Sequence, residues 1–138
     1  MAKKTSQKIL LIEDDSDQVY LYTVKFQLEG LNLVTAKNGV EGLEKVRQEK
    51  PDLILLDIVM KDMDGMEVLE NLKKDATTKD IPVVLLTNLV KKELLGKAKQ
   101  LGAVDFWSKT EVMPKDAVER IRKILNIPAK GALAPGGK

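Results

Sequence analysis

Short apolar runs alternate with longer amphipathic segments along this 138-residue chain. The runs lack the in-out alternation of a half-exposed strand, and such near-continuous hydrophobicity is typical of strands covered on both faces. They lie at residues 9–12, 31–36, 53–57, 83–87 and 104–107. The pattern therefore predicts five short buried strands.

Apolar residues between these runs recur at helical spacing. Examples are Val19, Thr23 and Phe26, then Leu94, Ala98 and Leu101, then Val118, Ile121 and Leu125. Residues that end helices or precede strands stand between the segments, at Gly30, Pro51, Pro82 and Gly102. Successive strand–helix units predict an α/β fold, a doubly wound parallel (βα)5 sheet with right-handed crossovers and helices on both faces.

The two ends of the chain differ from its middle in composition. Residues 1–8 and 126–138 carry five lysines and no acid, so the net charge of +2 conceals a charge of −3 over residues 9–125, where 18 basic and 21 acidic residues lie. The last segment is rich in Gly and Pro and has no apolar periodicity. We expect a disordered N-terminus at 1–7, one folded domain at 8–126 and a flexible C-terminal tail at 127–138.

Several absent features narrow the function. No apolar stretch approaches the roughly 18 to 20 residues of a membrane helix, and the first residues lack a signal-peptide core, so we expect a cytoplasmic protein. The chain has no Cys and no His, which excludes disulfides, thiol nucleophiles, Ser-His-Asp triads and His-ligated metals. The remaining carboxylate, hydroxyl and lysine chemistry suits hard cations such as Mg²⁺ or Ca²⁺.

Polar residues follow four of the predicted strands, at the edge where such folds bind ligands. They are Glu13-Asp14-Asp15, Asp57, Thr87 and Lys109. Carboxylates about 5 Å apart repel by roughly 3 kcal/mol at an effective dielectric constant of 20, and a divalent cation relieves that repulsion. Mg²⁺ fits best, because it takes one or two carboxylates together with waters and phosphate oxygens. The alternative is that Asp15, Ser16 or Asp17 simply caps the following helix.

Asp57 is the most informative of these residues. It follows an apolar run, and a charge at the end of a dry central strand requires a partner or a function. A carboxylate beside Mg²⁺ can attack phosphorus and form an acyl phosphate. Lys109 and Thr87 can then bind the phosphoryl oxygens. The alternatives are that Lys109 is a solvated surface lysine and that Thr87 is an ordinary residue of a β-strand.

The ordered set of motifs resembles the response-regulator receiver domain of two-component signalling, in its CheY-like, single-domain form. The resemblance covers roughly residues 7–127 and rests on residues 9–15, on Asp57 with Met63-Asp64-Gly65, and on residues 85–87 and 102–109. It implies a flavodoxin-like sheet with strand order 2-1-3-4-5. It also implies a phosphorelay function, in which Mg²⁺-dependent phosphoryl transfer from a histidine kinase or a small phosphodonor modifies Asp57.

The resemblance also implies a set of metal ligands. Asp57 is the phosphoacceptor and a ligand, and Asp14 binds Mg²⁺ directly. Glu13 acts mainly through water, and the backbone carbonyl of Val59 completes the protein ligands. Asp15 ranks below Glu13 and Asp14 as a ligand.

Three further residues have implied roles in switching. Thr87 and Lys109 bind the phosphoryl oxygens, and Phe106 is the aromatic residue whose rotamer follows Thr87. Phosphorylation then changes a protein-binding surface on the fourth helix, fifth strand and fifth helix. The chain is thus expected to be a phosphoacceptor switch, with only self-directed phosphorylation and dephosphorylation, rather than an enzyme.

The implied partners are proteins. A histidine kinase or phosphotransfer protein supplies the phosphoryl group, since the chain has no His of its own, and an unidentified downstream protein receives the signal. A phosphorylation-dependent homodimer is also compatible, whereas no membrane and no direct nucleic-acid contact is expected. One alternative is a phosphorylation-independent receiver-like binding module. A less favoured one is an aspartate-nucleophile phosphohydrolase, in which an acid rather than Val59 is expected two residues after Asp57.

Some positions depart from the family's usual pattern. Lys61 stands where proline is common, and Thr110 replaces the proline that usually follows the active-site lysine, which favours a trans Lys109–Thr110 peptide. Asn88 is larger than the usual residue after Thr87 and narrows access to the phosphoryl group. Val59 and Leu89 are apolar where the family often influences the attacking water, so we predict slow hydrolysis of the acyl phosphate.

Overall fold

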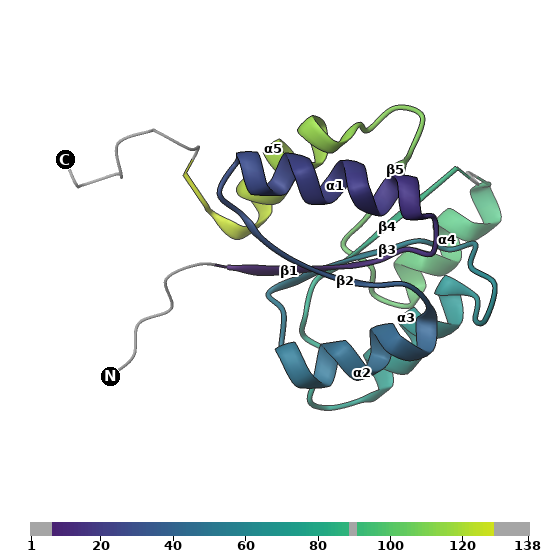
Figure 1. The fold of residues 1–138 in the computed structure, drawn as a ribbon. Helices are drawn as coiled ribbons and strands as arrows, with labels where there is room; N and C mark the ends of the chain where they lie inside the picture. Colours follow the sequence, from purple (N-terminus) through teal and green to yellow (C-terminus); the bar gives the residue numbers. More distant parts are fainter. Residues whose placement is uncertain (1–6, 89–90, 129–138) are drawn as a thin grey trace.

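The structure is a computed structural model, and it describes residues 7–88 and 91–128. Its strands form one parallel sheet in the order β2-β1-β3-β4-β5 (Figure 1). The strands are β1 (Lys8–Ile12), β2 (Asn32–Ala36), β3 (Leu53–Leu56), β4 (Val83–Thr87) and β5 (Asp105–Ser108). The helices are α1 (Ser16–Leu28), α2 (Gly39–Glu49), α3 (Gly65–Lys74), α4 (Lys92–Gln100) and α5 (Pro114–Leu125). The predicted fold class and strand order are confirmed.

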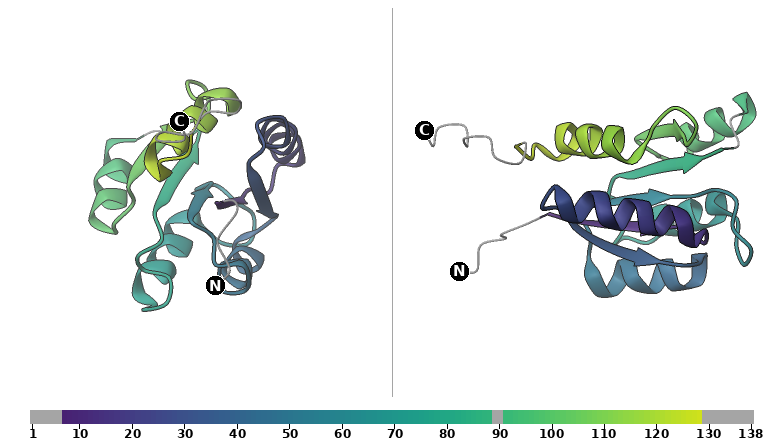
Figure 2. Two further views of the ribbon diagram at one scale, coloured as in Figure 1. Left: turned by 90° about the vertical axis from the view of Figure 1, so that its left-hand side faces the viewer. Right: turned by 45° about the horizontal axis from the view of Figure 1, so that its top comes forward.

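Helices cover both faces of the sheet, which explains why the central strands are apolar throughout. Odd-numbered residues of β1 and β3 pack beneath α1 and α5, where Phe26 and Ile121 are fully buried. Even-numbered residues of the same strands pack against α2, α3 and α4, where Leu69 is fully buried. Figure 2 shows the two helical layers from two further directions. The side chains of β1 and β3 alternate between two dry cores, so neither face of these strands needs polar residues.

Four strands differ from the predicted runs at a boundary, and the first of them, β1, begins one residue earlier, at Lys8. β2 begins at Asn32, because the Leu31 amide instead donates to the Phe26 carbonyl at the end of α1 (2.9 Å). β3 ends at Leu56, which leaves Asp57 just beyond the strand. β5 is shifted by one residue, since Asp105 rather than Val104 pairs with β4 in the ladder. The last shift still places Lys109 directly after the strand.

The expected helix ends are also found. Gly30 and Gly102 follow α1 and α4 with positive φ angles of 74° and 97°, a conformation that strains residues with a Cβ. Most of the expected flexible ends, 1–6 and 129–138, lies outside the described residues. No helix in the described part of the chain has the length and apolar character needed to cross a bilayer.

Candidate functional site

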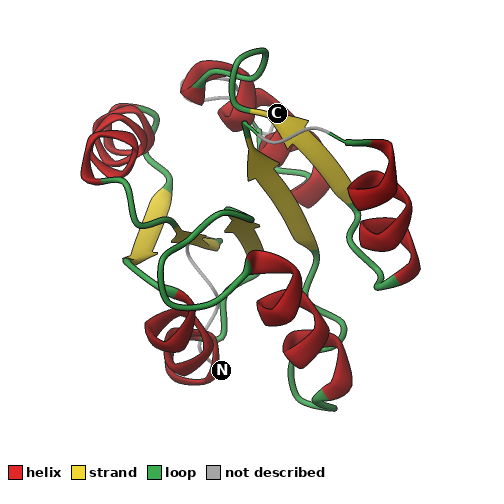
Figure 3. Cartoon of the chain, turned by 90° about the vertical axis from the view of Figure 1, so that its right-hand side faces the viewer, coloured by secondary structure: helices red, strands yellow, loops and turns green. Residues whose placement is uncertain are grey.

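The predicted polar residues gather at the carboxyl edge of the sheet, the side from which Figure 3 views the molecule. There they line a hollow of about 330 Å³ together with two neighbours. The lining residues are Glu13, Asp14, Asp15, Asp57, Val59, Thr87, Asn88 and Lys109. Residues that are up to 96 positions apart in sequence meet here because parallel strands end at one edge.

Asp57 is held by backbone contacts on both sides. Its amide donates to the Ile12 carbonyl of β1 (3.1 Å), and the Gly65 amide donates to the Ile58 carbonyl (2.7 Å). A Cβ at Gly65 would collide with the backbone oxygen of Asp57, so only glycine permits this approach of α3. The backbone of Asp57 is therefore held in place beside the hollow.

The electrostatic state of Asp57 is unusual for an aspartate. The residue is only 4% exposed. Burial, followed by the negative charge of Glu13, raises the pKa of Asp57 to about 7, even though Lys109 opposes the rise. A carboxyl group that is half-ionised near neutral pH suits a nucleophile whose charge is used in a reaction.

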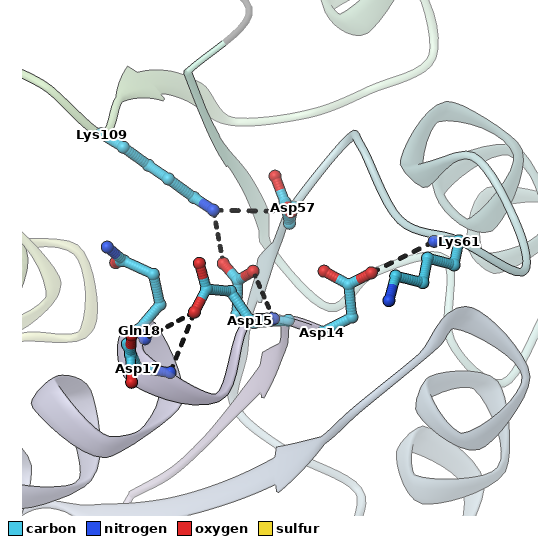
Figure 4. Close-up of polar contacts among 8 residues, drawn as sticks. Asp14, Asp15, Asp17, Gln18, Asp57, Lys61 and Lys109 are labelled. Carbon is cyan, nitrogen blue, oxygen red and sulfur yellow. Dashed lines mark hydrogen bonds and ion pairs between the residues drawn. The ribbon is translucent and has the colours of Figure 1, made fainter.

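Lys109 joins the acids across the hollow (Figure 4). Its Nζ lies 2.6 Å from Oε1 of Glu13 and 3.4 Å from Oδ2 of Asp57. The backbone amide of Lys109 donates to the Thr87 carbonyl (2.9 Å), which fixes where the side chain starts. The described residues contain no cis peptide bond, so the Lys109–Thr110 bond is trans, as its sequence favours. The trans bond still lets the ammonium reach both acids, with the shorter contact to Glu13.

The acidic residues after β1 divide into two groups. Oδ1 of Asp15 accepts hydrogen bonds from the amides of Asp17 (2.9 Å) and Gln18 (3.4 Å), so Asp15 caps α1. Glu13 and Asp14, in contrast, join Asp57 in a cluster in which one carboxylate oxygen from each residue lies within 4.8 Å of the others. Such a set of hard oxygen donors could hold one divalent cation. The capping alternative thus applies to Asp15 and leaves the other acids for a metal.

Phe106 lies apart from the hollow that contains Asp57. It is half-buried on β5, packs against the core beneath α4 and lines a separate small hollow of about 160 Å³ with Leu95, Ala98 and Ala103. Its neighbour Trp107 points to the opposite core and is fully buried there. Position 106 is therefore next to α4, on the surface that the sequence predicts to change.

The sequence alone did not assign a role to Asp62. Oδ1 and Oδ2 of this residue accept the amides of Gly39 (3.0 Å) and Val40 (3.1 Å) at the start of α2. The preceding amide, of Lys61, donates to Oδ2 of Asp14 (3.2 Å). An aspartate in a loop is common, and no local pattern indicates that it caps a helix 22 residues earlier in the chain.

Comparisons with known proteins agree on one family. The model of the response regulator receiver domain matches residues 9–122. PilH of Pseudomonas aeruginosa is 35% identical over 102 residues, which cover 74% of this chain and 84% of PilH. Sporulation initiation phosphotransferase F of Bacillus subtilis is 33% identical over 104 residues, or 75% of this chain and 82% of that protein.

A solved structure gives the same result for the fold. A CheY-like response regulator receiver domain protein from Methanospirillum hungatei JF-1 has a TM-score of 0.81 at 28% identity, covering 88% of this chain and 95% of the other. Other curated relatives are transcriptional regulators, and the chain spans about half their length. The matched region contains every residue of the hollow that surrounds Asp57. This chain therefore belongs to the response regulator receiver domains, the phosphoacceptor switches of two-component signalling.

Proposed function

We propose that Asp57 is the phosphoacceptor of this receiver domain and that the hollow around it is the phosphorylation site. The observation that carries the proposal is the placement of a nearly buried carboxylate, with a pKa raised to about 7, beside Lys109 and Thr87. Near neutral pH much of the Asp57 carboxyl is ionised and able to attack, while burial keeps the charge poorly solvated and reactive.

The chemical step is an in-line displacement at phosphorus. A bond forms between an Asp57 oxygen and the phosphorus, and the bond from phosphorus to the donor, a nitrogen in a phosphohistidine or an oxygen in an acyl phosphate, breaks with its electron pair. The Lys109 ammonium neutralises charge on the transferring group, and the Thr87 hydroxyl donates to one of its oxygens. Lys109 and Thr87 thus position and stabilise the transferring phosphoryl group, and the phosphodonor is the substrate of the step.

Mg²⁺ is the proposed cofactor. Asp14 and Asp57 supply oxygen ligands directly, Glu13 acts mainly through water, and the backbone carbonyl of Val59 completes the proposed protein ligands. When bound, Mg²⁺ supplies positive charge that offsets both the crowded carboxylates and the incoming phosphoryl oxygens. The support for this assignment is the donor set itself, since one oxygen from each of the three carboxylates lies within 4.8 Å of the others, and Lys109 pairs with two of them, Glu13 and Asp57.

Signal output requires the new charge at Asp57 to change a surface. The phosphoryl oxygens draw Thr87 and Lys109 toward them, and Phe106 turns into the space beside Thr87. This alters the α4–β5–α5 surface and its affinity for a downstream protein or a second copy of the chain. The phosphoryl source is a histidine kinase or a phosphotransfer protein in the cytoplasm. The domain spans 8–126 and works through protein contacts rather than by binding nucleic acid.

Intact mass measurement with Mg²⁺ and a small acyl phosphate or phosphoramidate tests the proposal. We expect one phosphoryl group on the wild type, none on Asp57→Asn, and wild-type labelling on the control Asp52→Asn, whose carboxylate lies at the opposite edge of the sheet. Labelling of Asp57→Asn would contradict the assignment of the site. A wild type that takes up no phosphoryl group from either donor would favour the phosphorylation-independent binding module.

A further inference from the structure

Two neighbouring residues of the loop between β3 and α3, Lys61 and Asp62, hold the loop by hydrogen bonds on two sides. Neither residue belongs to the cluster of Glu13, Asp14 and Asp57. On one side the Lys61 amide donates to Oδ2 of Asp14 (3.2 Å). On the other side both carboxylate oxygens of Asp62 accept amides at the start of α2, from Gly39 (3.0 Å) and Val40 (3.1 Å). Because the two contacts are made by consecutive residues, a shift of Asp62 also shifts the Lys61 amide.

The contact with Lys61 favours one orientation of the Asp14 carboxylate at the hollow. Asp14 follows the end of β1 and is only partly buried, so its side chain has freedom to rotate. The hydrogen bond engages Oδ2, and Figure 4 shows the other oxygen on the side of Asp57 and Asp15. A ligand that is already oriented loses less freedom when it binds a metal, and hydrogen bonds behind metal ligands are a usual way of achieving this.

The contact with Asp62 gives the loop a rigid support. Two amides at a helix N-terminus, together with the helix dipole, favour a negatively charged acceptor. The amides of Gly39 and Val40 accordingly hold the pKa of Asp62 below its ordinary value. Close packing of Met63 against Gly39 adds a second contact between the loop and α2. The loop position is therefore set by α2, which is itself packed on the sheet.

We propose that Asp62 and the backbone amide of Lys61 are positioning groups that orient Asp14 for Mg²⁺, so that the α2 N-terminus indirectly sets the affinity of the site for the metal. This inference rests on the proposed Mg²⁺ site at Glu13, Asp14 and Asp57. It assigns the role to the amide of Lys61 rather than to its side chain. A proline at position 61 has no N–H and could not make the contact.

Calorimetric titration of the folded protein with Mg²⁺ tests the role of Asp62. We expect Asp62→Ala to bind Mg²⁺ about tenfold more weakly than the wild type, the low end of the effect of losing a group behind a metal ligand. Asp62→Asn keeps one acceptor oxygen and should give an intermediate affinity. Asn38→Ala is the matched control, because the Asn38 side chain accepts the Glu41 amide of the same helix (2.8 Å), whereas Asp62 accepts the amides of Gly39 and Val40. It should bind like the wild type.

A second pair of variants separates the amide of Lys61 from its charge. Lys61→Pro should weaken Mg²⁺ binding about as much as Asp62→Ala, whereas Lys61→Ala keeps the amide and should bind at least as tightly as the wild type. Hydrogen exchange of the Lys61 amide, measured without metal, should be faster in Asp62→Ala than in Asn38→Ala. This readout reports the contact even if the metal affinities are weak.

The outcomes distinguish this inference from the function on which it rests. If the wild type binds Mg²⁺ and Asp62→Ala binds equally well, with circular dichroism showing a folded variant, the positioning role is wrong and the metal site stands. If Lys61→Ala loses affinity as Lys61→Pro does, the side chain rather than the amide acts, which also overturns the inference. If the wild type fails to bind Mg²⁺, both the metal site and the positioning role fall.

Discussion

Charged residues at the two edges of the sheet are arranged in opposite ways. At the amino edge, Lys8 pairs with Glu49 (Nζ to Oε1, 2.9 Å), and the side chains are 29% and 34% exposed. The Lys8 amide also donates to Asp52 (2.8 Å). At the carboxyl edge, Glu13 and Asp57 are almost fully buried, and the described residues bring them one cation, Lys109.

Structural and functional charges can be told apart in this fold by their burial and by how they are paired. At the amino edge a cation pairs with an anion in contact with water. Such pairs contribute little to the free energy of unfolding, and their charges keep most of their hydration. The carboxyl edge concentrates negative charge where solvation is poor, and burial, followed by the charge of Glu13, raises the pKa of Asp57. Folding alone does not require that arrangement, whereas the proposed Mg²⁺ and phosphoryl group would both make use of it.

Removal of the lysine at each edge should show the largest contrast. We expect Lys109→Met to lower the free energy of unfolding by about 3 kcal/mol at pH 8, since it leaves two buried carboxylates without their cation. The loss should shrink at pH 6, where Asp57 can take up a proton. Lys8→Met should cost less than about 1 kcal/mol. Urea denaturation measures both, and equal losses at the two edges would contradict the comparison.

The two edges should also depend on pH with opposite sign. The pKa of Asp57 is about 7 in the folded protein against an ordinary value of 3.8, so the folded state holds a proton that the unfolded state has lost. Stability contributed by this group therefore falls as pH rises between these values, by at most about 1.4 kcal/mol per pH unit. Urea denaturation from pH 4.5 to 8 should show the slope in the wild type and a flatter profile in Asp57→Asn.

Glu49 provides the opposing case at the amino edge. Its hydrogen bond and charge attraction to Lys8 hold its pKa below the ordinary value of 4.5. That contribution is present above pH 4.5 and is lost as pH falls below it. Glu49→Gln should therefore leave the profile from pH 4.5 to 8 unchanged. If Glu49→Gln removed this slope, the pH dependence of stability would arise at the amino edge, and its assignment to Asp57 would be wrong.

A divalent cation should stabilise through the carboxyl edge alone. At a Mg²⁺ concentration ten times its Kd, binding to the folded state adds about 1.4 kcal/mol to the free energy of unfolding. Asp14→Asn should lose most of this gain, and Asp52→Asn should keep it. Thermal and urea unfolding at matched ionic strength, with and without Mg²⁺, provide the measurement. A gain that survives in Asp14→Asn would place the cation elsewhere.

The smallest expected effect lies at the exposed rim of the carboxyl edge. Val59 lines the hollow and is 58% exposed, and its apolar side chain offers no hydrogen bond to a water that attacks the acyl phosphate. Val59→Asn should speed decay of phosphorylated protein by about threefold to tenfold, or roughly 1 kcal/mol in the barrier. Val104→Asn, at a similarly exposed valine, is the control. A fast wild-type decay that Val59→Asn leaves unchanged would refute slow hydrolysis. Leu89, the other residue in this prediction, lies outside the described residues.

Much of the fold could be predicted because its signals are local. Apolar runs of a few residues, helical repeats and the glycines after α1 and α4 each act within one element, and parallel sheets require dry strands. The boundaries were less predictable. Leu31 is apolar and fits a strand, but its amide caps the end of α1 instead. Competition between two partners for one amide depends on where the elements lie in space.

The residues that reach the carboxyl edge could be read from the sequence, because each ends or follows a strand and parallel strands end together. The sequence also restricted the chemistry to carboxylates, hydroxyls and lysines, since Cys and His are absent. How the acids are used depends on tertiary contacts: Asp15 caps α1, Glu13 makes the shorter contact to Lys109, and burial raises the pKa of Asp57. The same holds for Asp62, whose partners on α2 are distant in sequence. Hydrogen-bond geometry and desolvation depend on distances of a few ångströms between such segments, and packing of the helices on the sheet sets those distances.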